Sequence, residues 1–337
     1  MYSLIKKILF LLDPETSHTI SLKALKWCHR LGLTKLFSTK IKAPCEFMGL
    51  HFENPIGLAA GLDKNADYVD ALSDLGFGFI EIGTVTPRTQ MGNPKPRLFR
   101  LVNEEAIINR MGFNNKGADY VVKNLKKSRY RGVLGINIGK NKETPLDQAA
   151  DDYVICFRKL APFASYITIN ISSPNTPDLR NLQASAQLDA LLTTMKAEQQ
   201  YFNVEYQRYV PLVVKIAPDL TDDEVKEIAA ILIAKKIDGV IATNTTISRD
   251  GINESRYKNE AGGLSGKPLQ KRSADIIKKL HQHLQDRIPI IGVGGIMDEA
   301  SANEKWKAGA KLLQIYTGFI FKGPGLIKRL SRTKMSS

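Results

Sequence analysis

Cysteine is scarce in this sequence, and no two cysteines have the spacing of a metal-binding or redox motif. The three cysteines, Cys28, Cys45 and Cys156, are odd in number and irregularly spaced among 337 residues. This argues against a disulfide framework and a zinc site, and it favours a reducing compartment. We therefore expect no metal site in this protein.

Long hydrophobic runs and nucleotide-binding motifs are also missing. The N-terminal apolar run Ile8–Leu12 is far shorter than the roughly 20 residues that span a bilayer, and no A-x-A cleavage site follows it. Nothing matches a Walker loop, and no GxGxxG follows the first predicted strand. A nucleoside triphosphate and a Rossmann-bound NAD are therefore disfavoured. The five histidines and the carboxylates offer no compelling catalytic dyad.

Acidic residues are outnumbered, with 34 Asp and Glu against 48 Lys and Arg, which gives a net charge of +14. The excess is concentrated at the two ends. Residues 1–46 carry eight basic and three acidic side chains, and residues 319–337 carry five basic and no acidic ones. A basic surface attracts polyanions, so nucleic acid and anionic membrane are both candidate partners for these ends.

The N-terminal segment predicts two short amphipathic helices. The first is the apolar and basic stretch before Asp13, and the second begins at Asp13-Pro14 and runs to about Phe37, because Asp is a good N-cap and Pro suits the first helical position. Such a pair fits a monotopic membrane anchor. The alternative is a soluble cap packed on the main domain, which is the commoner use of amphipathic helices.

The rest of the chain alternates short apolar segments with amphipathic helical stretches such as Asp222–Ala234 and Ser273–Leu284. Near-continuous apolar runs are typical of parallel strands buried on both faces. Eight repeats predict a closed (β/α)8 TIM barrel, with an open doubly wound sheet as the alternative. The predicted strands are Ile56–Ala59, Gly78–Ile82, Val133–Ile138, Tyr166–Ile171, Leu212–Ile216, Gly239–Ala242, Ile288–Val293 and Leu312–Tyr316.

Small and polar residues follow every predicted strand, at the end where such barrels hold their active sites. Gly294 and Gly295, after the seventh strand, would let backbone N–H groups approach a phosphate. Asparagines also gather at these ends, and their amides suit a ligand with alternating C=O and N–H groups, such as a pyrimidine imide. Lys64 and Lys215 add two cations that could face a carboxylate and an electron-rich ring, although either alone could be a structural ion-pair residue.

Ser173, in the sequence Ser-Ser-Pro-Asn, is a candidate base in one of these loops. A hydroxyl is a poor base in water, so its proton must be relayed onward or its pKa lowered. A lone serine before proline is more often a turn residue, and the residues alone leave both interpretations open.

Ten segments, in order along the chain, resemble the quinone-linked, membrane-associated class of dihydroorotate dehydrogenases. They are GLAAGLDKN, EIGTVTPR, NRMGFNN, GINIGKNK, NISSPNTP, VKIAPDL, ATNTT, GGLSGKPL, GVGGI and YTGFIFKGP. The resemblance implies a (β/α)8 barrel that holds FMN and oxidises (S)-dihydroorotate to orotate in pyrimidine biosynthesis. It also implies that Ser173, which matches the family's catalytic base, is the base here, and the serine assigns the class, because the cytosolic class uses cysteine as its base.

The resemblance carries over two sets of binding residues. The expected FMN-binding residues are Ala60, Gly61, Leu62, Asp63, Lys64, Thr84, Asn137, Asn170, Lys215, Thr243, Gly266, Gly295, Tyr316 and Thr317. The expected substrate-binding residues are Lys64, Asn109, Arg110, Met111, Gly112, Phe113, Asn170, Asn175, Asn244 and Thr245.

The N-terminal helices are identified by the same resemblance as a membrane-associating extension that forms a quinone tunnel. The implied division is an extension at residues 1–45 and an FMN-binding catalytic barrel at residues 46–337. His18 and Arg100 match family positions near the tunnel. We expect a peripheral enzyme on the cytoplasmic side of the cell membrane, with anionic lipid and a membrane quinone as partners.

Two other functions compete with this one. A flavin barrel that reduces uridines in transfer RNA would suit the positive charge, but it needs a catalytic acid, usually cysteine, in a strand-end loop and a basic RNA-binding extension, and neither is found. We therefore expect no nucleic-acid partner. A peripheral membrane protein with a decayed barrel is disfavoured because Lys64, Ser173 and Lys215 are all present.

Overall fold

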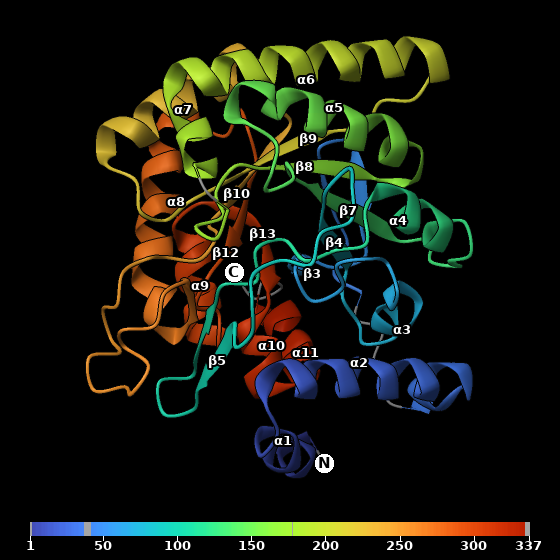
Figure 1. Cartoon of the computed structure of the whole chain (residues 1–337), viewed down its shortest axis with the longest axis vertical. Coiled ribbons are helices and arrows are strands. Elements are labelled where there is room, and N and C mark those ends of the chain that lie inside the picture. The colour runs from blue at the N-terminus through green and yellow to red at the C-terminus, as the bar shows by residue number, and fades with distance from the viewer. Residues whose placement is uncertain (1, 37–41, 177, 334–337) are drawn as a thin grey trace.

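Eight parallel strands close into a barrel in the computed structural model, which describes residues 2–36, 42–176 and 178–333 (Figure 1). Each strand pairs in parallel with its neighbours, in the order β10-β12-β13-β3-β4-β7-β8-β9. The strands are β3 (Ile56–Leu58), β4 (Phe79–Val85), β7 (Val133–Ile138), β8 (Tyr166–Asn170), β9 (Leu212–Ile216), β10 (Gly239–Ala242), β12 (Ile290–Val293) and β13 (Ala310–Ile315). The predicted closed barrel is confirmed, and the open-sheet alternative is wrong.

Helices surround the barrel and cover its outer face (Figure 1). They are α3 (Val69–Ser73), α4 (Ala118–Leu125), α5 (Ala149–Leu160), α6 (Ser185–Tyr206), α7 (Asp222–Ala234), α8 (Gln270–Leu284), α9 (Glu299–Lys307), α10 (Thr317–Lys322) and α11 (Gly325–Thr333). Short 3₁₀ turns occur at Leu33–Leu36, Leu146–Gln148, Ala161–Phe163, Leu179–Gln183 and Lys267–Leu269. Helix α7 begins as predicted, because Thr221 and Glu224 form a reciprocal capping box ahead of an apolar face.

The main core lies between the strands and the helices. All residues of β7, β8, β9 and β10 are buried, which explains their continuous apolar sequence. A second cluster fills the N-terminal end of the barrel, where the hairpin of β1 (Cys45–Phe47) and β2 (Leu50–Phe52) places Phe52 edge-on against Phe79. This closed end leaves the C-terminal strand ends as the open end of the barrel.

The two long insertions form a small antiparallel sheet beside the open end of the barrel. Strand β6 (Ala106–Asn109) pairs with β5 (Leu98–Leu101) on one side and with β11 (Gly263–Gly266) on the other. The insertion after the second barrel strand thus joins the insertion after the sixth. Their pairing brings Asn109 opposite Gly263, next to the strand ends that carry the polar residues.

The two N-terminal helices are present, as predicted, and lie against one side of the barrel near α3, α10 and β5 (Figure 1). Helix α1 spans Tyr2–Phe10 and α2 spans Pro14–Arg30, with the Asp13 side chain accepting hydrogen bonds from Glu15 N and Thr16 N. The predicted end near Phe37 is wrong: α2 stops before Gly32, which has a φ of +72°, and Phe37 lies outside the described residues. Among the described residues, none of the helices combines the length and the hydropathy that crossing a membrane requires.

Candidate active site

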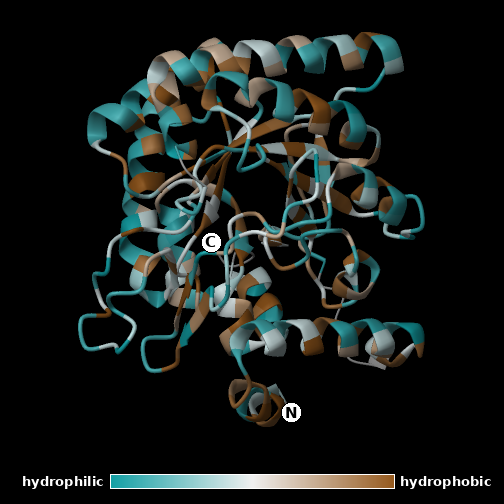
Figure 2. Cartoon of the chain, viewed as in Figure 1, coloured by the Kyte–Doolittle hydropathy of each residue, from teal (hydrophilic) through white to brown (hydrophobic). Residues whose placement is uncertain are grey.

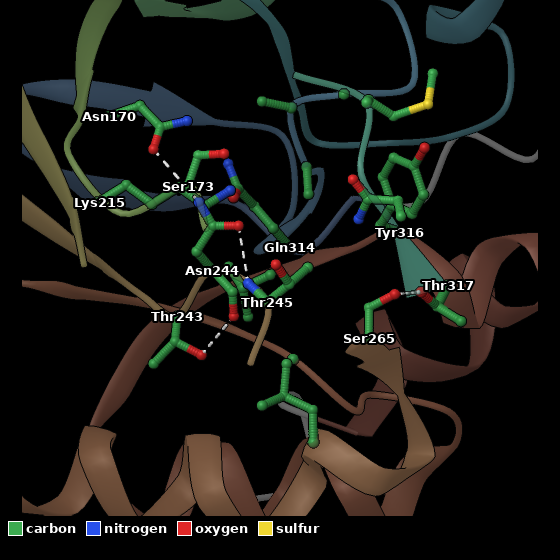
Figure 3. A pocket seen from close by; sticks show the side chains of 18 of the residues that line it. Asn170, Ser173, Lys215, Thr243, Asn244, Thr245, Ser265, Gln314, Tyr316 and Thr317 are labelled. Carbon is green, nitrogen blue, oxygen red and sulfur yellow. Dashed lines mark hydrogen bonds between the residues drawn. The ribbon is translucent and has the colours of Figure 1, made fainter. Parts of the chain in front are cut away.

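A cavity at the C-terminal end of the barrel gathers most of the predicted site residues. The cavity, together with the space at its open mouth, has a volume of about 1050 Å³. The predicted residues that line it come from every barrel strand except β7, and from the β5–β6–β11 insertion (Figure 3). They are Ala60, Gly61, Lys64, Thr84, Asn109, Met111, Gly112, Phe113, Asn170, Ser173, Asn175, Lys215, Thr243, Asn244, Thr245, Gly266, Gly295, Tyr316 and Thr317.

Four predicted residues do not line the cavity. The Asp63 carboxylate accepts hydrogen bonds from the backbone N–H groups of the following turn, and the Leu62 side chain is buried in the core. Arg110 turns its guanidinium to Glu260 and over the ring of Phe99. The fourth residue, Asn137, lies beneath the cavity floor. The structure therefore gives these four side chains scaffold contacts, and their predicted contacts with ligands stay predictions.

Asn137 organises the floor of the cavity. Its Oδ1 accepts hydrogen bonds from Thr84 Oγ1 at 2.6 Å and from Asn170 Nδ2 at 3.0 Å. Its own amide nitrogen donates to the buried carboxylate of Glu81 at 2.9 Å. Because that carboxylate only accepts, it sets the orientation of the Asn137 amide and through it the orientations of Thr84 and Asn170.

Glu81 is the centre of a polar network that sequence reasoning missed. Tyr166 donates to its carboxylate at 2.9 Å, and Gln314 Nε2 donates at 2.7 Å. Gln314 lines the cavity, and its Oε1 is a buried acceptor without a partner. Both Glu81 and Gln314 interrupt apolar strands, and a polar residue inside a strand that is buried on both faces could have indicated them.

The two predicted cations lie in the cavity wall, where Lys215 is buried and Lys64 is half-buried. Burial lowers the pKa of Lys64 to about 8, and its Nζ donates to Gly61 O at 2.9 Å. Burial also lowers the pKa of Lys215, although the nearby carboxylate of Glu81 opposes the shift. Neither lysine has a carboxylate within ion-pair distance among the described residues, so the interpretation of either as a structural ion-pair residue is not supported.

The loop that follows β8 presents polar atoms of Ser173 and Asn175 to the cavity. The Ser173 hydroxyl oxygen accepts a hydrogen bond from Asn175 N at 3.2 Å, and the Asn175 amide donates to Asn109 O at 3.1 Å. Across the floor, Asn244 Nδ2 donates to Ser172 Oγ at 3.0 Å. The amides of Asn109, Asn175 and Asn244 and the hydroxyl of Ser173 thus line a space that can hold a ring with amide-like edges.

Glycine-rich turns form the remaining wall of the cavity. Gly294 and Gly295 adopt φ values of +114° and +70°, and a Cβ on Gly295 would lie 2.3 Å from Gln270 Cα. The close approach requires glycine at this position. Ser265 and Thr317 share a hydrogen bond of 2.9 Å across the same wall, and Ser265 is a lining residue that sequence reasoning did not single out (Figure 3).

The N-terminal helices contact the elements around this cavity. The His18 ring nitrogen Nε2 lies 2.9 Å from Leu62 O, in the turn that carries Lys64. Arg100 covers the ring of Phe10 at 4.2 Å and donates to Phe10 O at 3.1 Å. Within the part of the chain that the structure describes, no group of three His, Cys, Asp or Glu residues could hold a metal ion.

Comparison with known proteins gives one consistent family. The profile of the family "Dihydroorotate dehydrogenase" matches residues 43–335. A protein named dihydroorotate dehydrogenase (quinone) from Idiomarina loihiensis is 59% identical over 331 residues, which cover 98% of this chain and 99% of that protein. One of the same name from Nitrosospira multiformis is 56% identical over 335 residues, covering 98% and 95%.

Solved structures agree with the sequence relatives. A crystal structure of DHODH in complex with ferulenol from Eimeria tenella superposes with a TM-score of 0.86 and 37% identity, over 96% of this chain and 91% of that one. The ligand-free DHODH from Eimeria tenella gives a TM-score of 0.85. With the family profile covering most of its length and two relatives above 55% identity, this chain belongs to the dihydroorotate dehydrogenase family.

Proposed function

We propose that this protein oxidises (S)-dihydroorotate to orotate in pyrimidine biosynthesis, with FMN as its cofactor and a membrane quinone as the final electron acceptor. The observation that carries the proposal is the convergence of Lys64, Ser173, Lys215 and Asn244 on one cavity. These residues are far apart in the sequence, and the proposal gives each a different role in binding or catalysis. The proposed reaction involves a small-molecule substrate, FMN and a quinone, and we propose no nucleic-acid partner.

The wall of Gly266, Gly295 and Thr317 suits the phosphate of FMN, because its backbone N–H groups can approach an anion closely. Lys215, Asn170 and Thr84 supply one cation and two neutral polar groups at the floor, where the ring system would lie. The unpartnered Gln314 Oε1 adds a buried acceptor to the same cavity. When bound at these residues, FMN would supply the redox chemistry of the reaction, as acceptor of the hydride from C6 of dihydroorotate and as donor of electrons to quinone.

The substrate has a carboxylate and a ring of alternating C=O and N–H groups. The amides of Asn109, Asn175 and Asn244 can both donate and accept, and they suit such a ring. The ammonium group of Lys64 suits the carboxylate, because a half-buried cation without a carboxylate in ion-pair distance is stabilised by an incoming anion. The remaining predicted residues, Met111, Gly112, Phe113 and Thr245, enclose the ring.

Ser173 is the proposed base that takes the proton from C5 of the substrate. Its hydroxyl is buried within the cavity lining, and Asn175 N donates to its oxygen. Serine must release its own proton as it accepts another, so a relay to solvent accompanies the step. The surrounding asparagines orient the substrate toward Ser173, and this orientation is a large part of what the protein contributes.

Residues 1–45 are proposed as the membrane-associating extension and residues 46–337 as the catalytic barrel. Leu4, Ile8 and Leu11 are 67%, 61% and 86% exposed, and Figure 2 shows α1 as largely hydrophobic. Basic residues of this segment suit anionic lipid on the cytoplasmic side of the cell membrane. Because His18 touches the turn of Lys64, quinone bound between the helices and the barrel would lie close to the cavity.

The proposal is tested by mixing the purified yellow enzyme with dihydroorotate anaerobically and without quinone. Bleaching of the flavin absorbance in a stopped-flow instrument, followed by recovery of the colour on adding quinone, is the expected result. A protein that takes up no FMN, or a bound flavin that stays oxidised, would refute the function.

A further inference from the structure

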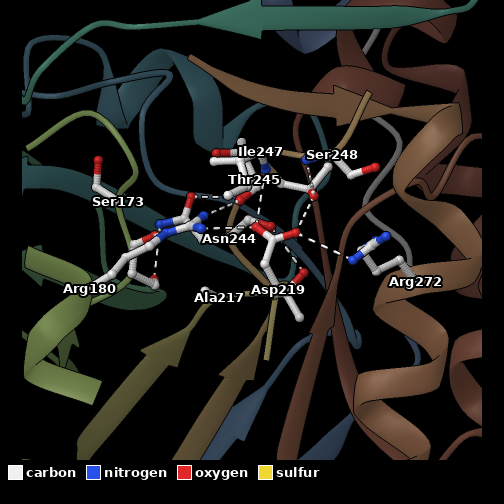
Figure 4. Close-up of polar contacts among 12 residues, drawn as sticks. Ser173, Arg180, Ala217, Asp219, Asn244, Thr245, Ile247, Ser248 and Arg272 are labelled. Carbon is white, nitrogen blue, oxygen red and sulfur yellow. Dashed lines mark hydrogen bonds and ion pairs between the residues drawn. The ribbon is translucent and has the colours of Figure 1, made fainter. Parts of the chain in front are cut away.

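Arg180 lies outside the cavity lining, yet its guanidinium joins two segments that both line the proposed substrate site. It belongs to the 3₁₀ turn Leu179–Gln183, which follows the Ser173 loop. Its Nε donates to Ser172 O at 3.2 Å, and its Nη2 donates to Thr245 O at 2.9 Å. Figure 4 shows the side chain of Arg180 between these two segments.

The accepting carbonyls lie next to residues that would contact substrate. The carbonyl of Ser172 belongs to the peptide group that links Ser172 to Ser173, so its hydrogen bond fixes the plane of the peptide that precedes the proposed base. The carbonyl of Thr245 follows Asn244, whose amide donates to Ser172 Oγ at 3.0 Å. One planar group thus sets the spacing between the base and a substrate-binding amide.

Asp219 holds the guanidinium in this position. It follows β9, and its Oδ2 accepts from Arg180 Nη1 at 2.9 Å. The same carboxylate accepts from Thr246 Oγ1 and from Ile247 N at 3.1 Å (Figure 4). The Arg180 and Asp219 side chains are only 21% and 12% exposed, so the pair is shielded from solvent and held from several directions.

We infer that Arg180, held by Asp219, is a positioning residue that aligns Ser173 with the substrate for proton transfer from C5. The inference rests on the proposed function. A guanidinium offers several donors in a fixed plane and can bind two carbonyls and a carboxylate together. A lysine ammonium is a single compact charge on a shorter side chain and lacks this planar set of donors. Charge alone therefore cannot replace Arg180.

The Arg180→Lys variant separates positioning from charge, because it keeps a cation beside Asp219. We expect normal FMN content and a limiting rate of flavin reduction by dihydroorotate that falls about 10- to 100-fold, as misalignment of reacting groups predicts. The dissociation constant of orotate, read from the flavin absorbance, should change by a smaller factor. Arg158→Lys is the matched control, since Arg158 makes a two-pronged ion pair with Glu198, at 2.7 and 2.6 Å, between α5 and α6.

A double-mutant cycle with Ser173→Ala decides whether Arg180 acts through the base. If it does, Arg180→Lys slows reduction much less in the Ser173→Ala background than in the parent. Full additivity, or a reduction rate in Arg180→Lys equal to that of the parent and of Arg158→Lys, would overturn the inference. A parent enzyme that dihydroorotate does not reduce would instead refute the proposed function, so the two failures are distinguishable.

Discussion

The imidazole of His18 and the carbonyl of Leu62 lie 2.9 Å apart, which ties helix α2 directly to the turn that carries Lys64. Burial, with the nearby charge of Lys64, lowers the pKa of His18 to about 4. His18 is therefore neutral near pH 7, and its Nε2–H donates to the carbonyl. The contact depends on pH, because protonation would place a buried cation beside Lys64.

Acid should loosen α2 from the barrel. In the undocked helix His18 has its ordinary pKa near 6.5, so the undocked form takes up a proton first as the pH falls. The favourable free energy of docking α2 on the barrel is greatest above about pH 6.5. It decreases progressively as the pH falls toward 4, by up to about 3 kcal/mol. Hydrogen exchange of α2 amides at pH 7 and pH 5, corrected for intrinsic rates, measures this change. His18→Gln should remove the acid dependence, and equal dependence in both proteins would assign it to another group.

Replacing Ser173 by alanine should separate binding from chemistry. The variant should keep its yellow colour and bind orotate, since the glycine turns and asparagines are unchanged. Flavin reduction by dihydroorotate should slow by about 10²- to 10⁴-fold, which is the usual contribution of a positioned base. Single-turnover stopped-flow rates make the comparison, with FMN content and orotate affinity as the controls for general disturbance of the loop. Unchanged reduction in Ser173→Ala would remove Ser173 from the mechanism.

The barrel could be predicted from sequence because its strands are buried on both faces and therefore stand out as short apolar runs. The predicted ranges Val133–Ile138, Leu212–Ile216 and Gly239–Ala242 agree with the structure at both ends. The strands β5, β6 and β11 were not predicted, because four-residue strands within long insertions have too little periodicity to be recognised. The pairing of β11 with β6 also joins residues more than 150 positions apart.

The site was predictable where a motif fixes the backbone and less so where a distant partner fixes the side chain. Gly295 and Ser173 lie in the cavity because strand-end loops must converge there. Arg110 belongs to an equally clear motif, but its side chain turns to Glu260, 150 residues away. Glu81 could have been noticed as a polar residue within an apolar strand, but its partners Tyr166 and Gln314, like the partners of Arg180, come together only in the folded chain.

Orotate binding should weaken at alkaline pH because of Lys64. With a pKa of about 8 in the free site, the side chain is protonated below that pH and loses its charge above it. The dissociation constant of orotate should be flat below about pH 8 and rise by up to about tenfold per pH unit above it, since only the cation attracts the carboxylate. Titrations followed by flavin absorbance between pH 6 and 10 give the profile. In Lys64→Met, binding should be weak throughout and show no inflection near pH 8; an inflection that persists there would belong to a different group.

The exposed face of α1 should be needed for membrane binding. Leu4 and Ile8 are more than half exposed, and replacing both by glutamine removes apolar area that would otherwise enter a lipid surface. A loss of about 2 kcal/mol, or roughly 30-fold in partition coefficient, is expected in sedimentation with anionic phospholipid vesicles.

Tyr201→Gln with Val204→Gln is the control, because these residues are 62% and 61% exposed on α6, at the far end of the molecule from α1 in Figure 1. Flavin reduction by dihydroorotate should be unchanged in both double variants, while turnover with vesicle-bound quinone should fall only in the α1 variant. Equal vesicle binding by the two would mean that α1 packs against protein in its working state and that another surface meets the lipid.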